Sequence, residues 1–149
     1  MVTDVAVDTN ILIYAQFPAF AEHAGAHAAV ERLLADRSGR MVLTVAILHE
    51  LVHVVTDSRR FEPPLSMAEA IRMVRAYLGR LNVRIVHSDE IDLANALALL
   101  EEHGLGRQRV ADTLLAATLR RYSVNTLWTG NVRDFQVFPF LEAIDPTEG

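Results

Sequence analysis

Short apolar runs alternate with longer amphipathic stretches along the chain, and this pattern predicts its secondary structure. Compact runs rich in Val, Ile and Leu predict strands, and apolar residues that recur every three or four positions predict helices. The predicted strands cover residues 4–7, 41–44, 83–86, 126–128 and 140–144. The predicted helices cover residues 11–15, 21–36, 45–57, 66–81, 89–103, 109–122 and 132–135. The alternation indicates an α/β fold, with a central parallel sheet of about four to five short strands flanked by helices on both faces.

Local signals mark several ends of these elements. Ser66 and Ser88 are suited to begin helices, because a serine hydroxyl accepts a hydrogen bond from the free N–H groups of a first turn. Gly104 is suited to end one. Glu62-Pro63-Pro64 should separate two helices, because proline clashes with the preceding turn. Since no repeat or long linker interrupts the pattern, we expect residues 1–149 to form a single domain.

Composition excludes several classes of protein. The absence of cysteine excludes disulfides, thiolate metal sites and thiol nucleophiles, and it suits a reducing cytoplasm. All 14 basic residues are arginine, so a Walker A loop or a lysine Schiff base is impossible. Asp4 and Asp8 interrupt the first apolar stretch, which argues against a secretory signal. The apolar run 41–48 is too short to span a membrane, and we therefore expect a cytoplasmic protein.

The net charge of −5 is unusual for a protein that binds nucleic acid, because such proteins usually present a basic surface. This objection weakens if several acids surround a divalent cation. Of the 19 acidic residues, 15 would remain against 14 arginines once four are assigned to a metal site. The metal would then supply local positive charge.

Two acids follow predicted strands, where functional groups of open parallel sheets collect. Asp8 comes directly after the first strand, and Asp134 follows the strand 126–128 together with Thr129 and Asn131. Each has an ordinary structural explanation. Asp8 could serve as the cap of the next helix, and the stretch that carries Asp134 could be a polar turn with a cap.

Two further acids lie in apolar helices. Asp112 shares a helix face with Leu115 and Ala116, where a carboxylate is costly unless it is paired or bound to metal. Alternatively, it could be an acid at a helix start, favoured by the helix dipole. Glu50 follows Ile47-Leu48, and taken alone it could be an ordinary exposed glutamate.

Four stretches that contain these acids resemble, in the same order, the motifs of PIN-domain ribonucleases, and most closely those of the VapC toxins of bacterial toxin–antitoxin pairs. The stretches are Val7-Asp8-Thr9-Asn10-Ile11-Leu12, Leu48-His49-Glu50-Leu51, Ala111-Asp112-Thr113-Leu114-Leu115-Ala116-Ala117 and Thr129-Gly130-Asn131-Val132-Arg133-Asp134-Phe135. The chain departs from the pattern at Asn131, where many relatives carry an acid. The fourth acid is then best assigned to Asp134.

The resemblance implies a PIN-like fold and a Mg²⁺- or Mn²⁺-dependent endoribonuclease that leaves 5′-phosphate and 3′-hydroxyl ends. Hard divalent cations prefer oxygen ligands and activate water for attack on phosphodiesters. Asp8 and Asp112 are expected to hold the principal ion. Glu50 and Asp134 are expected to bind a second ion or to act through water.

Other polar residues of the motifs are expected to support this site. Residues that could orient the carboxylates by hydrogen bonds are Thr9, Asn10, Thr129 and Asn131. Arginines that could contact phosphate, or could simply be solvated, are Arg107, Arg109 and Arg133.

The resemblance also implies partners. We expect a VapB-type antitoxin encoded nearby, an RNA substrate, a homodimer and no membrane association. The apolar helices on either side of Pro63-Pro64 could form the groove that receives the antitoxin, or they could be ordinary core elements.

Two other functions stay open at this point. His49-Glu50-Leu51-Val52-His53 matches the HExxH pattern of zinc metallopeptidases, although Thr56 and Arg59 stand where the metzincin extension needs glycine and histidine. The commoner explanation of His49 and His53 is a pair of partly buried helix histidines. His23 and His27 have the same spacing and are expected to be a surface pair. The chain could also be a non-catalytic PIN-like binding module.

Overall fold

A parallel sheet of five strands organises the computed structural model, which describes residues 3–148. Residues 1, 2 and 149 of the expected domain lie outside the described residues. The strands are β1 (Thr3–Val7), β2 (Gly39–Thr44), β3 (Val83–Val86), β4 (Thr126–Trp128) and β5 (Glu142–Ile144), in the spatial order β3-β2-β1-β4-β5. Val5 pairs with Met41 on one side of β1, and Ala6 pairs with Leu127 on the other. The carboxyl ends of all five strands therefore meet at one edge of the sheet.

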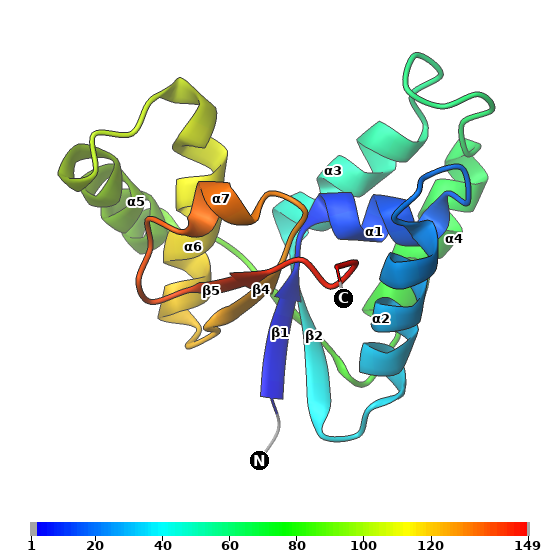
Figure 1. Ribbon diagram of the computed structural model, residues 1–149, viewed down its shortest axis with the longest axis horizontal. Helices are drawn as coiled ribbons and strands as arrows, with labels where there is room; N and C mark the ends of the chain where they lie inside the picture. Colours follow the sequence, from blue (N-terminus) through cyan, green and yellow to red (C-terminus); the bar gives the residue numbers. More distant parts are fainter. Residues whose placement is uncertain (1–2, 149) are drawn as a thin grey trace.

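Helices cover both faces of the sheet. They are α1 (Thr9–Gln16), α2 (His23–Ala35), α3 (Val45–Val55), α4 (Met67–Leu78), α5 (Glu90–Glu102), α6 (Val110–Arg121) and α7 (Val132–Phe135), with a 3₁₀ turn over Arg107–Arg109. Helices α1 to α4 gather on one side and α5 to α7 on the other (Figure 1). The predicted fold class is confirmed. In residues 3–148, no helix is long and apolar enough to cross a bilayer.

Strands β1 and β2 each contain a continuous apolar run, because each face of the sheet packs on its own core. Val5 and Val7 point into the core beneath α1 to α4, whereas Ala6 between them points into the core beneath α5 to α7. Met41 and Val42 divide between the two cores in the same way. Side chains alternate across a strand, so burial on both faces produces a continuous apolar run.

Most of the predicted boundaries lie within a few residues of the observed ones. Ser66 caps α4, and Glu69 completes the capping box. Gly104, which follows α5, adopts a φ of 59°. This left-handed conformation is tolerated best by glycine, which has no Cβ. The Pro63-Pro64 break lies between α3 and α4, as predicted.

The predicted cap of α5 is wrong. Asp89, rather than Ser88, caps α5, because its carboxylate accepts hydrogen bonds from the N–H groups of both Ile91 and Asp92. The Ser88 hydroxyl instead shares a hydrogen bond of 2.7 Å with the hydroxyl of Thr118. The last strand starts at Glu142, two residues later than predicted.

Candidate active site

Asp8 stands at the carboxyl edge of the sheet, between β1 and α1. Its Oδ1 accepts a hydrogen bond from the Thr9 N–H at 2.8 Å, so it does cap α1. Its Oδ2 accepts a second hydrogen bond from the Thr129 hydroxyl at 2.9 Å. Burial raises the pKa of Asp8, and the negative charge of Glu50 adds to this effect, while the two hydrogen bonds lower it. Asp8 therefore caps α1 and also holds its carboxylate in a fixed position near Glu50.

Glu50 reaches the same edge from α3. It is exposed, as an ordinary helix glutamate would be, but its Oε2 accepts a hydrogen bond from the buried Thr9 hydroxyl at 3.0 Å. Thr9 thus connects the start of α1 to α3. Its backbone N–H orients Asp8 and its side chain orients Glu50.

Asp112 lies in the first turn of α6, facing acids from the other half of the molecule. The pKa of its carboxyl is raised to about 6, and burial is the largest cause. The negative charges of Asp8, Asp134 and Glu50 contribute to this rise. The guanidinium of Arg109 lowers it. The four acids, which are far apart in the sequence, are therefore electrostatic neighbours.

Asp134 lies on α7 and is held by Arg109. The Nη1 of Arg109 donates to the carbonyl oxygen of Asp134 at 2.9 Å, and its Nη2 lies 3.3 Å from Oδ1. Arg109 is therefore engaged with a protein carboxylate rather than free for phosphate. Arg107 and Arg133 are exposed.

Thr129 and Asn10 shape the loop between β4 and α7. The buried Thr129 hydroxyl oxygen accepts the Asn131 N–H at 3.1 Å while the hydroxyl donates to Asp8. The amide oxygen of Asn10 accepts the Gly130 N–H at 3.0 Å. Of the four predicted support residues, Thr9 and Thr129 contact carboxylates directly. The Asn10 side chain contacts the loop that carries Thr129, and Asn131 contacts Thr129 through its backbone N–H alone.

The four acids offer a hard divalent cation the oxygen ligands that it prefers. Within residues 3–148, no three of the carboxylates and imidazoles already stand close enough to bind one ion together. Burial is the largest cause of the raised pKa of Asp112, and repulsion from the neighbouring carboxylates adds to it. A bound divalent cation would relieve this repulsion, so the donor set fits such an ion.

Comparisons with known proteins identify the family of this chain. A family model described as the PIN domain matches residues 5–141. The chain belongs to the PIN-domain family. It is 31% identical over 139 residues to ribonuclease VapC33 of Mycobacterium tuberculosis, covering 93% of this chain and 95% of that protein. It is 30% identical over 145 residues to ribonuclease VapC24 of the same organism, covering 95% of this chain and 96% of that protein.

A solved structure shares the fold of this PIN-domain chain. VapBC-1 from nontypeable Haemophilus influenzae superposes with a TM-score of 0.68 at 21% identity, over 98% of this chain and 100% of that chain. The predicted resemblance to VapC-type PIN proteins is thus confirmed.

The HExxH pattern finds no support in the geometry of this PIN-domain protein. His49 and His53 are both exposed on α3, and the expectation that they are partly buried is wrong, because α3 packs on the core through Ile47, Leu48 and Leu51 instead. Glu50 turns toward Thr9 and the carboxylates. Within the described residues, no further histidine or acid joins these two histidines to supply the third protein ligand of a catalytic zinc site.

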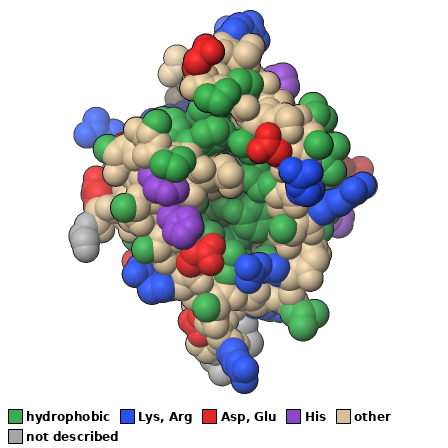
Figure 2. All heavy atoms as spheres, turned by 90° about the vertical axis from the view of Figure 1, so that its right-hand side faces the viewer, with side chains coloured by type: hydrophobic (Ala, Val, Ile, Leu, Met, Phe, Trp, Pro, Cys, Tyr) green, Lys and Arg blue, Asp and Glu red, His purple; other side chains and the backbone are tan. Residues whose placement is uncertain are grey.

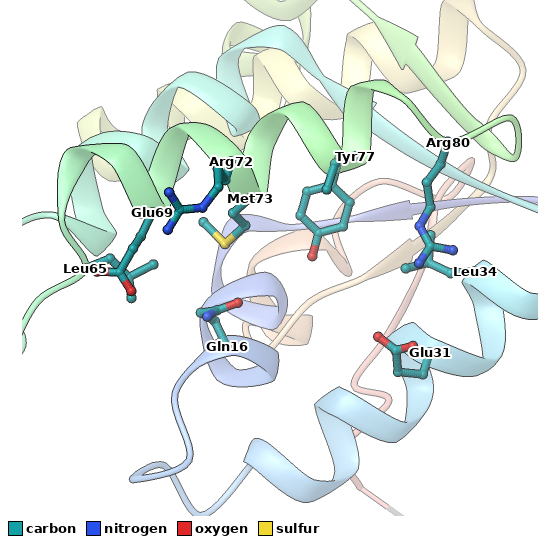
Figure 3. A pocket seen from close by; sticks show the side chains of 10 residues that line it. Gln16, Glu31, Leu34, Leu65, Glu69, Arg72, Met73, Tyr77 and Arg80 are labelled. Carbon is teal, nitrogen blue, oxygen red and sulfur yellow. The ribbon is translucent and has the colours of Figure 1, made fainter.

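A groove between α2 and α4 is separate from the candidate active site, and none of the four acids of that site lines it. Figure 2 shows an apolar hollow on this side of the molecule with charged side chains at its rim. In Figure 3, Met73 and Tyr77 project from α4 toward α1 and α2. Burial raises the pKa of Tyr77 to about 12. The groove measures about 440 Å³, and its lining includes Gln16, Glu31, Leu34, Leu65, Glu69, Arg72, Met73, Tyr77 and Arg80.

The sequence predicted a groove between the helices on either side of Pro63-Pro64, and only one of those helices lines the observed groove. Helix α4 follows that break and lines the groove as expected. The opposite wall is α2 with the end of α1, rather than α3.

Proposed function

We propose that this chain is a metal-dependent endoribonuclease toxin of a type II toxin–antitoxin pair, which hydrolyses RNA phosphodiesters at a carboxylate site. The observation that carries the proposal is the electrostatic environment of Asp112, whose pKa responds to Asp8, Glu50 and Asp134 at once. Convergence of four acids from four segments at the edge of a parallel sheet suits metal-assisted hydrolysis. The relatives VapC33 and VapC24, both named ribonucleases, support RNA as the substrate.

In this proposal Asp8 and Asp112 hold Mg²⁺ or Mn²⁺ directly, and Glu50 and Asp134 bind a second ion or hold water. When bound, the cation lowers the pKa of water and stabilises charge that develops on the phosphate. Thr129 donates to Asp8 and so aims its lone pairs. Thr9 does the same for Glu50, so each of these carboxylates is oriented before the ion arrives.

We also propose a VapB-type antitoxin as partner, and a homodimer that acts in the cytoplasm. The solved VapBC-1 structure, which shares this fold, supports a partner of this kind. The groove between α2 and α4 offers that partner Met73 and Tyr77 together with several charged side chains. Met73→Glu should then weaken capture of the co-expressed antitoxin while leaving RNA cleavage by the free chain intact. Unchanged capture would place the antitoxin elsewhere.

The experiment that tests the proposed activity is sequencing of RNA 5′ ends after induction of the wild-type chain and of Asp8→Asn. The wild type should produce new 5′-phosphate ends that the variant does not produce. His49→Ala with His53→Ala serves as a control, because these exposed side chains should be dispensable for a carboxylate site. Activity that survives Asp8→Asn but is lost in the histidine double variant would overturn the proposal.

A further inference from the structure

His23, the first residue of α2, is held in one tautomer by the backbone of α1. Its Nδ1 lies 2.8 Å from the carbonyl oxygen of Tyr14. A carbonyl oxygen can only accept a hydrogen bond, so Nδ1 must carry the proton and donate it. In the neutral ring, the other nitrogen, Nε2, then keeps its lone pair. A backbone carbonyl that fixes one ring nitrogen in this way is the usual support of a histidine that binds metal through the other.

His27 lies one helical turn further along α2, on the same side of the helix as His23. The two ring centroids are 5.5 Å apart, and the ring planes are inclined by 40°. Two imidazoles that share a tetrahedral ion through bonds of about 2.1 Å have ring centres about 5 Å apart. The observed separation thus already approaches that of a chelating pair. His23 is partly exposed and His27 is exposed, so an ion can reach both rings from solvent.

We propose that His23 and His27 form a second metal site, which binds Zn²⁺, Cu²⁺ or Ni²⁺. Imidazole nitrogen favours these borderline ions, whereas the carboxylate site favours Mg²⁺ or Mn²⁺. Within the described part of the chain, no third histidine or acid completes the group, so water fills the remaining coordination positions. Because His23 also holds Tyr14, the bound ion would fasten the last turn of α1 to the first turns of α2.

The site is tested by titrating protein that carries no polyhistidine tag with Cu²⁺ and recording electron paramagnetic resonance. The wild type should bind copper with hyperfine couplings from two imidazole nitrogens. His23→Ala with His27→Ala should lose one bound equivalent and these couplings. The matched control is His49→Ala with His53→Ala, which removes a pair of the same spacing on α3. This control should keep the copper signal assigned to α2.

Loss of folding is separated from loss of binding by the single variant His27→Ala. His27 is exposed, and its replacement leaves the His23 contact with Tyr14 in place, so metal-free thermal unfolding should match that of the wild type. Zn²⁺ should raise the unfolding temperature of the wild type more than that of His27→Ala, since binding to the folded state stabilises it. A copper signal and a zinc shift that are the same in wild type and His27→Ala would overturn the proposal. Neither measurement depends on RNA cleavage.

Discussion

The guanidinium of Arg109 holds Asp134 through the backbone carbonyl at 2.9 Å and through the carboxylate at 3.3 Å. Arg109 directly precedes α6, three residues before Asp112, so one side chain links the α6 acid to the α7 acid. The contact holds Asp134 on α7, directly after a loop in which Asn131 supplies no charge. It also places positive charge beside Asp112.

Replacing Arg109 should therefore weaken the metal site. We expect Arg109→Ala to lower Mn²⁺ affinity and kcat by about tenfold, as the loss of an orienting contact to a metal ligand usually does. Isothermal titration with Mn²⁺ and RNA cleavage kinetics measure the two effects. Arg107→Ala, in the same 3₁₀ turn but exposed, is the matched control. Equal effects of the two variants would show that Arg109 acts only as a general positive charge.

The raised pKa of Asp112 predicts how activity depends on pH. A carboxylate must be ionised to bind a cation, and this group has a pKa of about 6 in the metal-free protein. Cleavage at limiting Mn²⁺ should therefore fall as the pH drops through about 6, and saturating Mn²⁺ should shift the fall to lower pH. A rate profile at two Mn²⁺ concentrations tests this. Superimposable profiles would contradict a role for Asp112 as a metal ligand.

Ionisation of Asp112, which activity requires, should lower the stability of the metal-free protein. Because the folded-state pKa of Asp112 lies above its ordinary value of 3.8, the folded state binds the proton more tightly than the unfolded state. This contribution to stability is present at low pH and is lost as the pH rises through about 6. Asp112→Asn should thus stabilise the metal-free protein at pH 8 by about 1 kcal/mol, allowing for solvent screening. Thermal unfolding in chelator measures the change, and destabilisation at pH 8 would contradict the expected repulsion.

The hydroxyl of Thr129 should matter for chemistry more than for folding. Thr129→Val keeps the shape of the buried side chain but removes the hydrogen bond to Asp8 and the one from the Asn131 N–H. We expect kcat to fall about tenfold with KM for RNA nearly unchanged, because Asp8 loses its orientation rather than its charge. Thr129→Ser retains the hydroxyl and should restore most of the activity. If Ser and Val behaved alike, packing rather than the hydrogen bond would explain the effect.

Asp92 gives a contrasting test of an acid that serves only the fold. Its side chain is fully buried on α5, and it accepts hydrogen bonds from Arg121 at 2.7 and 2.9 Å. The hydrogen bond from Arg121 lowers the pKa of Asp92, so its stabilising effect is lost as the pH falls through the depressed pKa. Asp92→Ala should cost about 3 kcal/mol of unfolding free energy, because it breaks a pair with one buried partner. Denaturant unfolding against Glu90→Ala, an exposed acid on the same helix, checks this, and a loss below that of Glu90→Ala would contradict it.

The alternation of apolar runs and amphipathic stretches was sufficient to predict the sheet and its covering helices. Strands buried on both faces give continuous apolar runs, whereas helices buried on one face give apolar residues every three or four positions. Both patterns can be recognised in a short stretch of sequence. Capping at Ser66 was equally readable, because Glu69 lies three residues later and completes the box. Ser88 misled because its neighbour Asp89 can cap the same helix, while Thr118 lies close to Ser88 only after folding.

The site was only partly readable from local pattern. Thr9 and Thr129 stand next to motif residues, so their support of carboxylates could be anticipated. The contact of Arg109 with Asp134 joins positions 25 apart, and no local pattern distinguishes such an arginine from a solvated one. The wall of the groove that α2 supplies depends on how α2 packs against α1, which is a property of the folded chain.

The central claim is that Asp8 and Asp112 share a divalent cation. A crystal structure of the wild-type chain soaked in Mn²⁺, with anomalous scattering recorded at the manganese edge, tests it most directly. We predict one strong peak in contact with carboxylate oxygens of both residues, at bond lengths of about 2.0–2.6 Å. No peak between these two carboxylates at saturating Mn²⁺, or a peak held by other residues, would contradict the account.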